Sequence, residues 1–260
     1  RKAQRTPMSL RYPIRLSANE NPWGPGPQAR AAIVAATDEG CRYGMDFNAR
    51  LVEAIAAKEK VEKDRIVIGS GSGELLHMLA LAYCDRGQVV CAWPTFGQLM
   101  GFAEKVGSET RKIPVDADLR HDLPALAADT TPNTALLYVC NPNNPTGTVI
   151  DGPTLRKFCG EMAQRTLVVV DEAYLDLVDE GATESMADLA RAGANLIVLR
   201  TFSKIHGLAG LRVGYGIAPP AVVQRLKRYQ MATPNVLGIA AATASLGDAE
   251  FLTRTRASLI

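Results

Sequence analysis

The hydrophobic and polar positions along the chain follow two kinds of repeat. Apolar residues have helical spacing over about Gln28–Asp38 and Ala49–Glu59. Short β-branched runs then alternate with segments of helical length, and the runs lie at Ile66–Ile68, Val89–Ala92, Arg111–Val115, Ala135–Val139, Leu167–Val170 and Leu196–Leu199. Strands separated by helices in this way are typical of a largely parallel sheet with helices on both faces. The pattern therefore predicts an α/β fold.

Both ends of the chain depart from this alternation. The first residues are rich in proline and glycine and reach "SANENPWGPGP", so residues 1–27 are predicted to form an extended arm. Residues 28–247 would form the large domain. The final stretch, "DAEFLTRTRASLI", has the spacing of an amphipathic helix without a cap. We expect residues 248–260 to begin a helix that leads towards a further domain.

Composition restricts the class of protein. Hydrophobic residues make up 47% of the 260 residues and the net charge is only +2, so bulk electrostatics favour neither nucleic acid nor an anionic membrane. The five cysteines lack CxxC spacing and lie mostly in apolar runs, which indicates buried thiols rather than disulfides or a metal site. No apolar run approaches the ~18 residues of a membrane span, and residues 1–16 are too polar for a signal peptide. We expect a cytoplasmic protein.

The chemically unusual residues follow the predicted strands. In chain order, five strands are followed by "GSGSGE", "PTF", "NPNNPTG", "DEAY" and "TFSK". In open sheets of this kind, ligands bind at the carboxyl ends of the strands. We therefore expect the five segments to line one site.

Two of these segments also have a purely structural interpretation. The "GSGSGE" segment (Gly69–Glu74) would expose backbone N–H groups that suit a phosphate, but a plain glycine turn is equally consistent with it. It matches neither the Walker A loop nor the dinucleotide fingerprint. The "NPNNPTG" segment (Asn141–Gly147) is typical of a rigid turn, in which Asn144 could also hold a ligand oxygen.

Asp171 and Lys204 are the strongest candidates for chemistry. Three valines lead to Asp171 at the end of a buried strand, where a carboxylate needs a cation, either an arginine or the protonated ring nitrogen of a cofactor. Tyr174 could reach the same ligand. Most lysines are exposed, so a solvated surface lysine is one interpretation of Lys204. In an apolar setting, its neutral amine would instead be a nucleophile for an aldehyde. Arg212 stays charged and suits a phosphate. Pyridoxal phosphate (PLP) would use all five strand ends.

The segments "NPNNPTG", "VVDEAY" and "SKIHGLAGLRVGY", in this order, resemble the class I/II aminotransferases of PLP fold type I. The opening "LSANENPWGP" and the later "RY" are similar to the histidinol-phosphate aminotransferase branch. The resemblance covers nearly the whole chain. It implies a three-layer α/β/α large domain with a mainly parallel sheet.

The resemblance also implies roles for individual residues. Lys204 would hold the cofactor as a Schiff base and move the Cα proton, while Asp171 would keep the pyridine nitrogen protonated. Asn144 and Tyr174 would hydrogen-bond the phenolic oxygen, and Phe96 would stack on the ring.

The phosphate of the cofactor has an implied site of its own, formed by Ser72, Gly73, Thr201, Ser203 and Arg212. Tyr43 would reach the phosphate of a neighbouring subunit, which requires a homodimer. Two positions depart from the family. Gly73 stands where relatives often have aspartate, and "RYGMD" replaces the usual "RYPD" around Tyr43.

The implied activity is amino transfer from a donor such as L-histidinol phosphate to a 2-oxo acid, 2-oxoglutarate. Two alternatives stay open. One is a PLP-dependent decarboxylase or lyase similar to threonine-phosphate decarboxylase, and the other is a non-catalytic chain that binds PLP or a partner subunit. Members of the family continue into a small domain with the arginine for the substrate carboxylate, and nothing in this sequence matches that domain.

Overall fold

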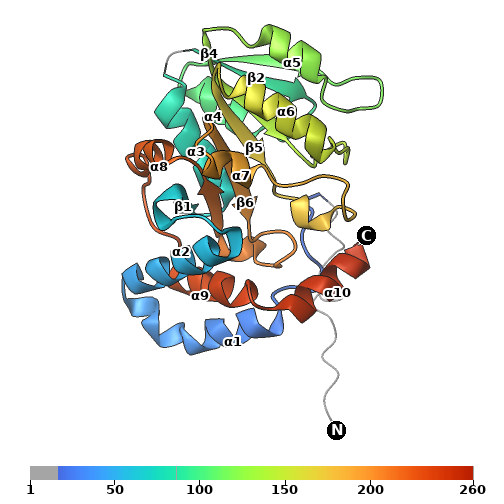
Figure 1. Cartoon of the computed structure of the whole chain (residues 1–260). Helices are drawn as coiled ribbons and strands as arrows, with labels where there is room; N and C mark the ends of the chain where they lie inside the picture. The colour runs from blue at the N-terminus through green and yellow to red at the C-terminus, as the bar shows by residue number, and fades with distance from the viewer. Residues whose placement is uncertain (1–16, 86, 260) are drawn as a thin grey trace.

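One sheet forms the centre of the protein (Figure 1). The computed structural model describes residues 17–85 and 87–259, so most of the predicted arm lies outside the described residues. The strands of the sheet are β1 (Ile66–Gly69), β2 (Gln88–Trp93), β3 (Glu109–Pro114), β4 (Thr134–Cys140), β5 (Leu167–Asp171), β6 (Leu196–Thr201) and β7 (Gly214–Ile217). Their order across the sheet is β1-β7-β6-β5-β4-β2-β3.

The sheet is mainly parallel, as the sequence predicts. β3, β2, β4, β5 and β6 pair in parallel, whereas β7 pairs antiparallel with both β1 and β6. Because β1 and β6 are both antiparallel to β7, they run in the same direction as each other. The carboxyl ends of all six predicted strands therefore meet at one edge of the sheet.

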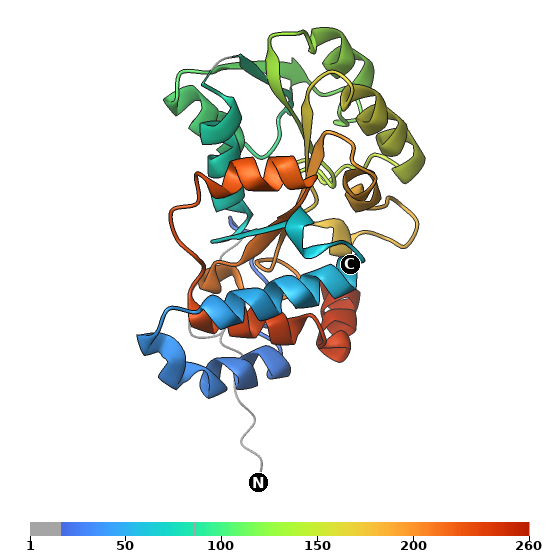
Figure 2. The same ribbon diagram turned by 60° about the vertical axis from the view of Figure 1, so that its left-hand side comes forward.

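Helices cover both faces of the sheet (Figures 1 and 2). They are α1 (Pro27–Ala35), α2 (Met45–Glu59), α3 (Ser72–Tyr83), α4 (Gln98–Lys105), α5 (Leu123–Asp129), α6 (Gly152–Met162), α7 (Ala187–Arg191), α8 (Pro220–Lys227), α9 (Val236–Ser245) and α10 (Ala249–Leu259). Apolar residues of α3, α4 and α8 form the core on one face. Residues of α1, α2, α5, α6, α7 and α9 form the core on the other. The three-layer prediction is confirmed.

The alternation of side chains along β5 assigns its residues to the two cores. Val168 and Val170 pack into the core with α6 and α9, and Leu167 and Val169 pack into the core with α3 and α4. Successive side chains of a strand point to opposite faces. Asp171 therefore points to the same side of the sheet as Leu167 and Val169, the side covered by α3 and α4.

Several helices begin where the sequence supplies a cap. Asp151 accepts a hydrogen bond from the Thr154 amide at the start of α6 (2.9 Å), and Asn235 accepts one from the Gly238 amide at the start of α9 (2.7 Å). Such caps contribute about 1 kcal/mol each to helix stability. The helix expected over Gln28–Asp38 ends earlier, at Ala35, and a 3₁₀ helix follows at Thr37–Cys41.

β7 is the strand that the sequence pattern missed. It is only four residues long and contains two glycines, so it lacks the β-branched run that indicates a strand. Gly214 is required there, because a Cβ atom at this position would lie 2.4 Å from the Ser72 amide nitrogen. The glycine lets β7 pass directly against the start of α3.

The end of the arm packs on the start of α10 (Figure 1). A Cβ atom on Gly26 would lie 2.8 Å from the ring of the buried Phe251, and the Gln28 amide donates to Asp248 (3.2 Å).

Within the described part of the chain, no single helix is long and apolar enough to cross a membrane, although α9 and α10 pass that test as a pair bent by 83°.

Four of the five cysteines are buried, as the sequence indicates. Cys84, Cys91, Cys140 and Cys159 are buried free thiols, whereas Cys41 is exposed. Burial raises the pKa of the Cys140 thiol to about 12. This thiol therefore stays protonated at neutral pH.

We expect His206 to make the protein acid-sensitive. Burial, followed by the positive charge of Lys58, lowers the pKa of His206 to about 3, and its Nδ1 has no hydrogen-bond partner among the described residues. A histidine in the unfolded chain has a pKa of about 6.5. Between these values the unfolded state binds more protons, so stability present above pH ~6.5 is lost as the pH falls towards 3.

Urea unfolding at about pH 7 and about pH 5 measures this effect. His206→Gln removes the titrating group, so the wild type should lose about 2 kcal/mol more than the variant between the two pH values. An equal loss in the two proteins would contradict a role for His206.

Candidate active site

A cavity of about 620 Å³ lies where the parallel strands end. Its lining includes Cys140, Asp171 and Thr201, which are the last residues of β4, β5 and β6. Ten of the eleven site residues predicted from the sequence line it, namely Ser72, Gly73, Phe96, Asn144, Asp171, Tyr174, Thr201, Ser203, Lys204 and Arg212. The five strand-end segments therefore meet in one place.

Asp171 is a buried carboxylate with neutral hydrogen-bond donors. It is 2% exposed and accepts hydrogen bonds from the Tyr138 hydroxyl (3.0 Å) and the Ala173 amide (3.1 Å). Burial raises the pKa of Asp171, and these two donors and the charge of Lys204 offset part of that rise. No arginine forms an ion pair with Asp171 among the described residues, so the salt-bridge interpretation of this residue is wrong.

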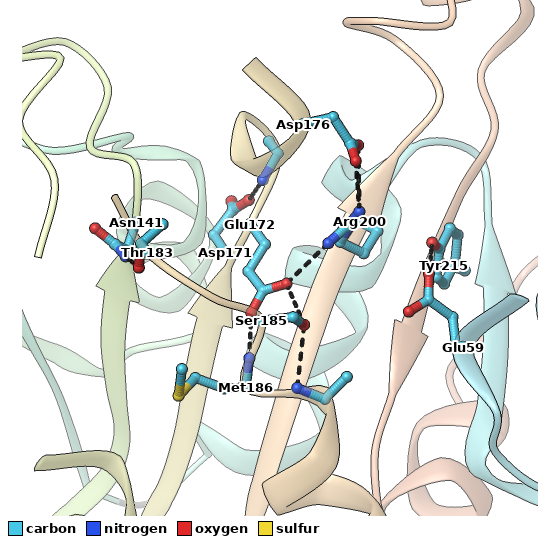
Figure 3. A network of polar contacts seen from close by, with 12 residues as sticks. Glu59, Asn141, Asp171, Glu172, Asp176, Thr183, Ser185, Met186, Arg200 and Tyr215 are labelled. Atoms are coloured by element: carbon cyan, nitrogen blue, oxygen red, sulfur yellow. Dashed lines mark hydrogen bonds and ion pairs between the residues drawn. The ribbon is translucent and has the colours of Figure 1, made fainter. Parts of the chain in front are cut away.

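The arginine of this region pairs instead with the next residue, Glu172 (Figure 3). Arg200 on β6 donates to Glu172 (3.0 Å) and to Asp176 (3.1 Å). Glu172 also accepts from the Ser185 hydroxyl (2.8 Å) and the Met186 amide (2.7 Å). This buried network lies on the face of the sheet opposite Asp171. It anchors the segment after β5 and so holds the carboxyl end of β5, where Asp171 lies, in place.

The amine of Lys204 points towards the arm. Its Nζ donates to the carbonyl oxygens of Ala18 (3.0 Å) and Asn19 (3.3 Å), and it lies 5.3 Å from the centre of the Tyr174 ring. The Asn21 side chain donates back to the carbonyl of Lys204 (3.3 Å). Lys204 is partly buried in the cavity. The alternative of a fully exposed surface lysine is therefore wrong.

Tyr174 and Asn144 form one wall beside the lysine. The Tyr174 hydroxyl accepts from the Asn144 side chain (3.5 Å) and from the Asn19 side chain (3.0 Å). These contacts leave the hydroxyl hydrogen of Tyr174 free to donate to a ligand oxygen. The turn that carries Asn144 thus presents its side chain to the cavity.

A cradle for an anion lies at the start of α3. The first N–H groups of a helix lack intrahelical partners and favour negative charge, and Ser72 and Gly73 are the first residues of α3. Arg212 reaches the same place and donates to the Ser203 hydroxyl (3.3 Å), which in turn accepts from Thr201 (3.0 Å). Arg212 has a positive φ of 53°, so the backbone is held in an uncommon conformation that directs this side chain.

Tyr43 is the predicted site residue that does not line the cavity. It is 98% exposed and precedes α2. Met45, at the start of α2, is 77% exposed. Nothing in the described chain brings the Tyr43 hydroxyl to the Ser72–Arg212 cradle.

The cavity also contains residues that sequence reasoning did not single out. They are Ser17, Ala18, Asn19, Glu20, Gln98, Cys140, Pro145, Ala173, Ala209 and Gly210. Gln98 comes two residues after Phe96 in the "PTF" segment, and that proximity is the signal that could have identified it. The arm residues lie in the "LSANENPWGP" segment, but no local pattern indicates that this segment lines the cavity, because its position depends on contacts with Lys204 and Tyr174, far away in the chain.

Comparisons with known proteins agree with this geometry. The sequence profile of the family "Aminotransferase class I and II" matches residues 12–260. Histidinol-phosphate aminotransferase from Moorella thermoacetica is 44% identical over 246 residues, and aromatic amino acid aminotransferase from Rhodococcus opacus is 41% identical over 249. Each alignment covers 94% of this chain. The chain spans 64% of the length of the Moorella protein and 69% of the Rhodococcus protein.

A solved structure has the same fold. Histidinol-phosphate aminotransferase from Sinorhizobium meliloti, in complex with pyridoxal-5'-phosphate, matches with a TM-score of 0.86 and 30% identity. The match covers 92% of this chain and 66% of that one.

Proposed function

The chain belongs to the class I and II aminotransferase family, and on that basis we propose that it is a PLP-dependent aminotransferase. We propose that residues 28–247 form its cofactor-binding domain. The buried free cysteines support our proposal that it works in a reducing compartment, the cytoplasm.

One observation carries the proposal. Asp171 is a buried carboxylate that forms no ion pair among the described residues, and it lines the same cavity as an amine and an anion cradle. These groups fit PLP, because the cofactor has a basic ring nitrogen, an aldehyde and a phosphate. The S. meliloti relative contains this cofactor. The carboxylate, the amine and the anion cradle of the cavity therefore match the three polar groups of PLP.

We propose the following residues as the holders of the cofactor. Lys204 would bind it covalently through Nζ, and Asp171 would pair with its ring nitrogen. The flat ring of Phe96 would stack on it. Asn144 and Tyr174 would donate to its phenolic oxygen, and the phosphate would lie on the cradle formed by Ser72, Gly73, Thr201, Ser203 and Arg212.

The bound cofactor supplies an aldehyde that takes up the amino group and a ring that withdraws electrons from the donor's Cα. The chain moves and holds the protons. Lys204 would remove the proton from the Cα of the donor as a general base and return it as a general acid. Asp171 would hold a proton on the ring nitrogen, because the buried carboxylate is stabilised by an adjacent positive charge.

We favour L-histidinol phosphate as the amino donor and 2-oxoglutarate as the acceptor. The name of the Moorella relative and the "NENPWGP" arm support this choice. The R. opacus relative, an aromatic amino acid aminotransferase, favours an aromatic amino acid as the second candidate. Both donors carry a flat ring next to the amino-bearing carbon chain.

Product analysis tests this proposal. The intact chain, verified by mass spectrometry, is incubated with PLP, 2-oxoglutarate and either L-histidinol phosphate or L-phenylalanine. Formation of glutamate with the matching oxo product is the expected result. Release of carbon dioxide in a parallel incubation with O-phospho-L-threonine would support a decarboxylase instead. No turnover of any donor by an intact chain that binds PLP would favour the non-catalytic alternative.

We further propose that two copies of the chain share their sites. The support is Tyr43, which is 98% exposed beside the exposed Met45 rather than packed in its own subunit. In a homodimer, the Tyr43 hydroxyl would donate to the phosphate bound by the partner subunit.

Tyr43→Phe should weaken PLP binding while leaving the fold intact. A hydrogen bond to a charged group is worth about 1.5–3 kcal/mol, so the Kd should rise by about ten- to a hundredfold. Titration of the apo-protein with PLP, beside sedimentation of the same sample, measures both points. Tyr229→Phe, at another exposed tyrosine, serves as the control. Unchanged affinity, or a fully active monomer, would show that the site is complete within one chain.

A further inference from the structure

Gln98 is a polar residue of the cavity with no assigned role. It is the first residue of α4 and lies two residues after Phe96. It lines the cavity together with Ser72 and Gly73. The loop after β2 therefore brings a carboxamide to the same region as the start of α3.

The carboxamide of Gln98 fills the space that a side chain at position 73 would occupy. A Cβ atom built on Gly73 would lie 2.8 Å from Gln98 Nε2, 3.0 Å from Oε1 and 3.2 Å from Cδ. All three distances are shorter than ordinary van der Waals contact. Gly73 and Gln98 are therefore complementary, because any larger residue at position 73 would displace the carboxamide from the first turn of α3.

The carboxamide has no hydrogen-bond partner within residues 17–85 and 87–259. A glutamine side chain offers two N–H donors and an oxygen that can accept two hydrogen bonds. Neighbouring polar side chains of the cavity satisfy one another, as Arg212, Ser203 and Thr201 do. The donors of Gln98 are left for a ligand in the cavity.

The charges nearby indicate what that ligand group is. Gln98 lies against the N-terminal turn of α3, which favours an anion, and the guanidinium of Arg212 donates to the carbonyl oxygen of Ser70, two residues before this helix (3.3 Å). In such a place the Nε2 group is favoured over the Oε1 group as the one that faces the ligand. An amide donor here adds to a set of donors that already suits a phosphate.

We propose that Gln98 is a phosphate-binding residue, which donates through Nε2 to the phosphate held at the start of α3 and takes the place of a side chain at position 73. The proposal rests on the proposed function for the identity of the ligand, PLP. It explains how the cradle keeps a further polar donor although position 73 is glycine.

Three ligands separate the possible roles of Gln98. They are PLP, inorganic phosphate and pyridoxal, which has the ring and the aldehyde but no phosphate. Gln98→Leu should raise the Kd of the apo-protein for PLP and for inorganic phosphate by about tenfold, because a hydrogen bond to a charged group is lost. Pyridoxal should bind the variant and the wild type equally. Gln164→Leu, at an exposed glutamine of the loop after α6, is the control and should change none of the three.

A second variant tests the pairing with Gly73. Gly73→Ala should weaken phosphate binding in the wild-type background, since the added methyl group displaces the carboxamide. The same change should have little effect on phosphate binding in the Gln98→Leu background. Equal effects in both backgrounds would contradict the proposed pairing.

The outcomes distinguish this inference from the proposed function. Unchanged affinity of Gln98→Leu for inorganic phosphate, or an equal loss for pyridoxal and PLP, would overturn the role of Gln98. Failure of the wild-type chain to bind PLP would overturn the proposed function instead. In that case the phosphate titration alone still decides whether Gln98 binds an anion.

Discussion

Replacing Lys204 with alanine is expected to abolish amino transfer. Lys204 supplies the amine that faces the cavity, where its Nζ lies near Tyr174 and the carbonyls of the arm. Loss of a positioned acid–base group alone costs about 10²–10⁴-fold in rate, and the covalent link to the cofactor is lost as well. Turnover should therefore fall by at least about a thousandfold.

Two further variants control for charge and for the general loss of a lysine. Lys204→Arg keeps the positive charge but cannot be deprotonated, so it should be as inactive as Lys204→Ala. Lys157→Ala, at an exposed lysine of α6, should be fully active. Substantial activity in Lys204→Arg would show that only the charge at this position matters, and would contradict the role we give to Lys204.

Asp171→Asn should leave PLP bound but lower turnover by much more than tenfold. A neutral amide can still accept the hydrogen bond from Tyr138, so the local fold is kept. It cannot stabilise a positive charge on the ring nitrogen, so the electron-withdrawing form of the ring is lost. A rate within about tenfold of the wild type, about 1.4 kcal/mol of barrier, would rule out this role.

The adjacent carboxylate gives a matched comparison. Glu172→Gln makes the same change of charge one residue away, but Glu172 holds Arg200 on the opposite face of β5 (Figure 3). Breaking a buried ion pair by removing one partner typically destabilises a protein by about 3–5 kcal/mol. We therefore expect Glu172→Gln to lower the free energy of unfolding and Asp171→Asn to lower turnover. If both variants lost stability and activity alike, Asp171 would be a structural residue.

Most of the fold could be predicted from the hydrophobic pattern, because buried parallel strands read as continuous apolar runs. β7 could not, since its course depends on Gly214 passing the start of α3 rather than on a strand-like pattern. Its omission did not disturb the predicted site. β1 and β6, which lie on either side of β7, still run in the same direction.

The candidate site was predictable where residues follow strands and not where loops fold back. Asp171 and Thr201 end their strands, so topology alone brings them together. The arginine that the sequence offered as one possible partner of Asp171 pairs with Glu172 instead, because side chains alternate along β5 and Glu172 faces the side on which Arg200 lies. Asn19 reaches Tyr174 across 155 positions of sequence, and no local pattern indicates such a contact.

Borohydride reduction of the PLP-treated chain, followed by peptide mapping, shows which lysine carries the cofactor. Reduction makes a covalent link between a lysine and PLP permanent, so the modified lysine can be identified by mass. We expect a phosphopyridoxyl group on the peptide that contains Lys204, together with loss of the yellow colour of the bound cofactor. Modification of a different lysine, or a chain that carries no such group after reduction, would contradict it.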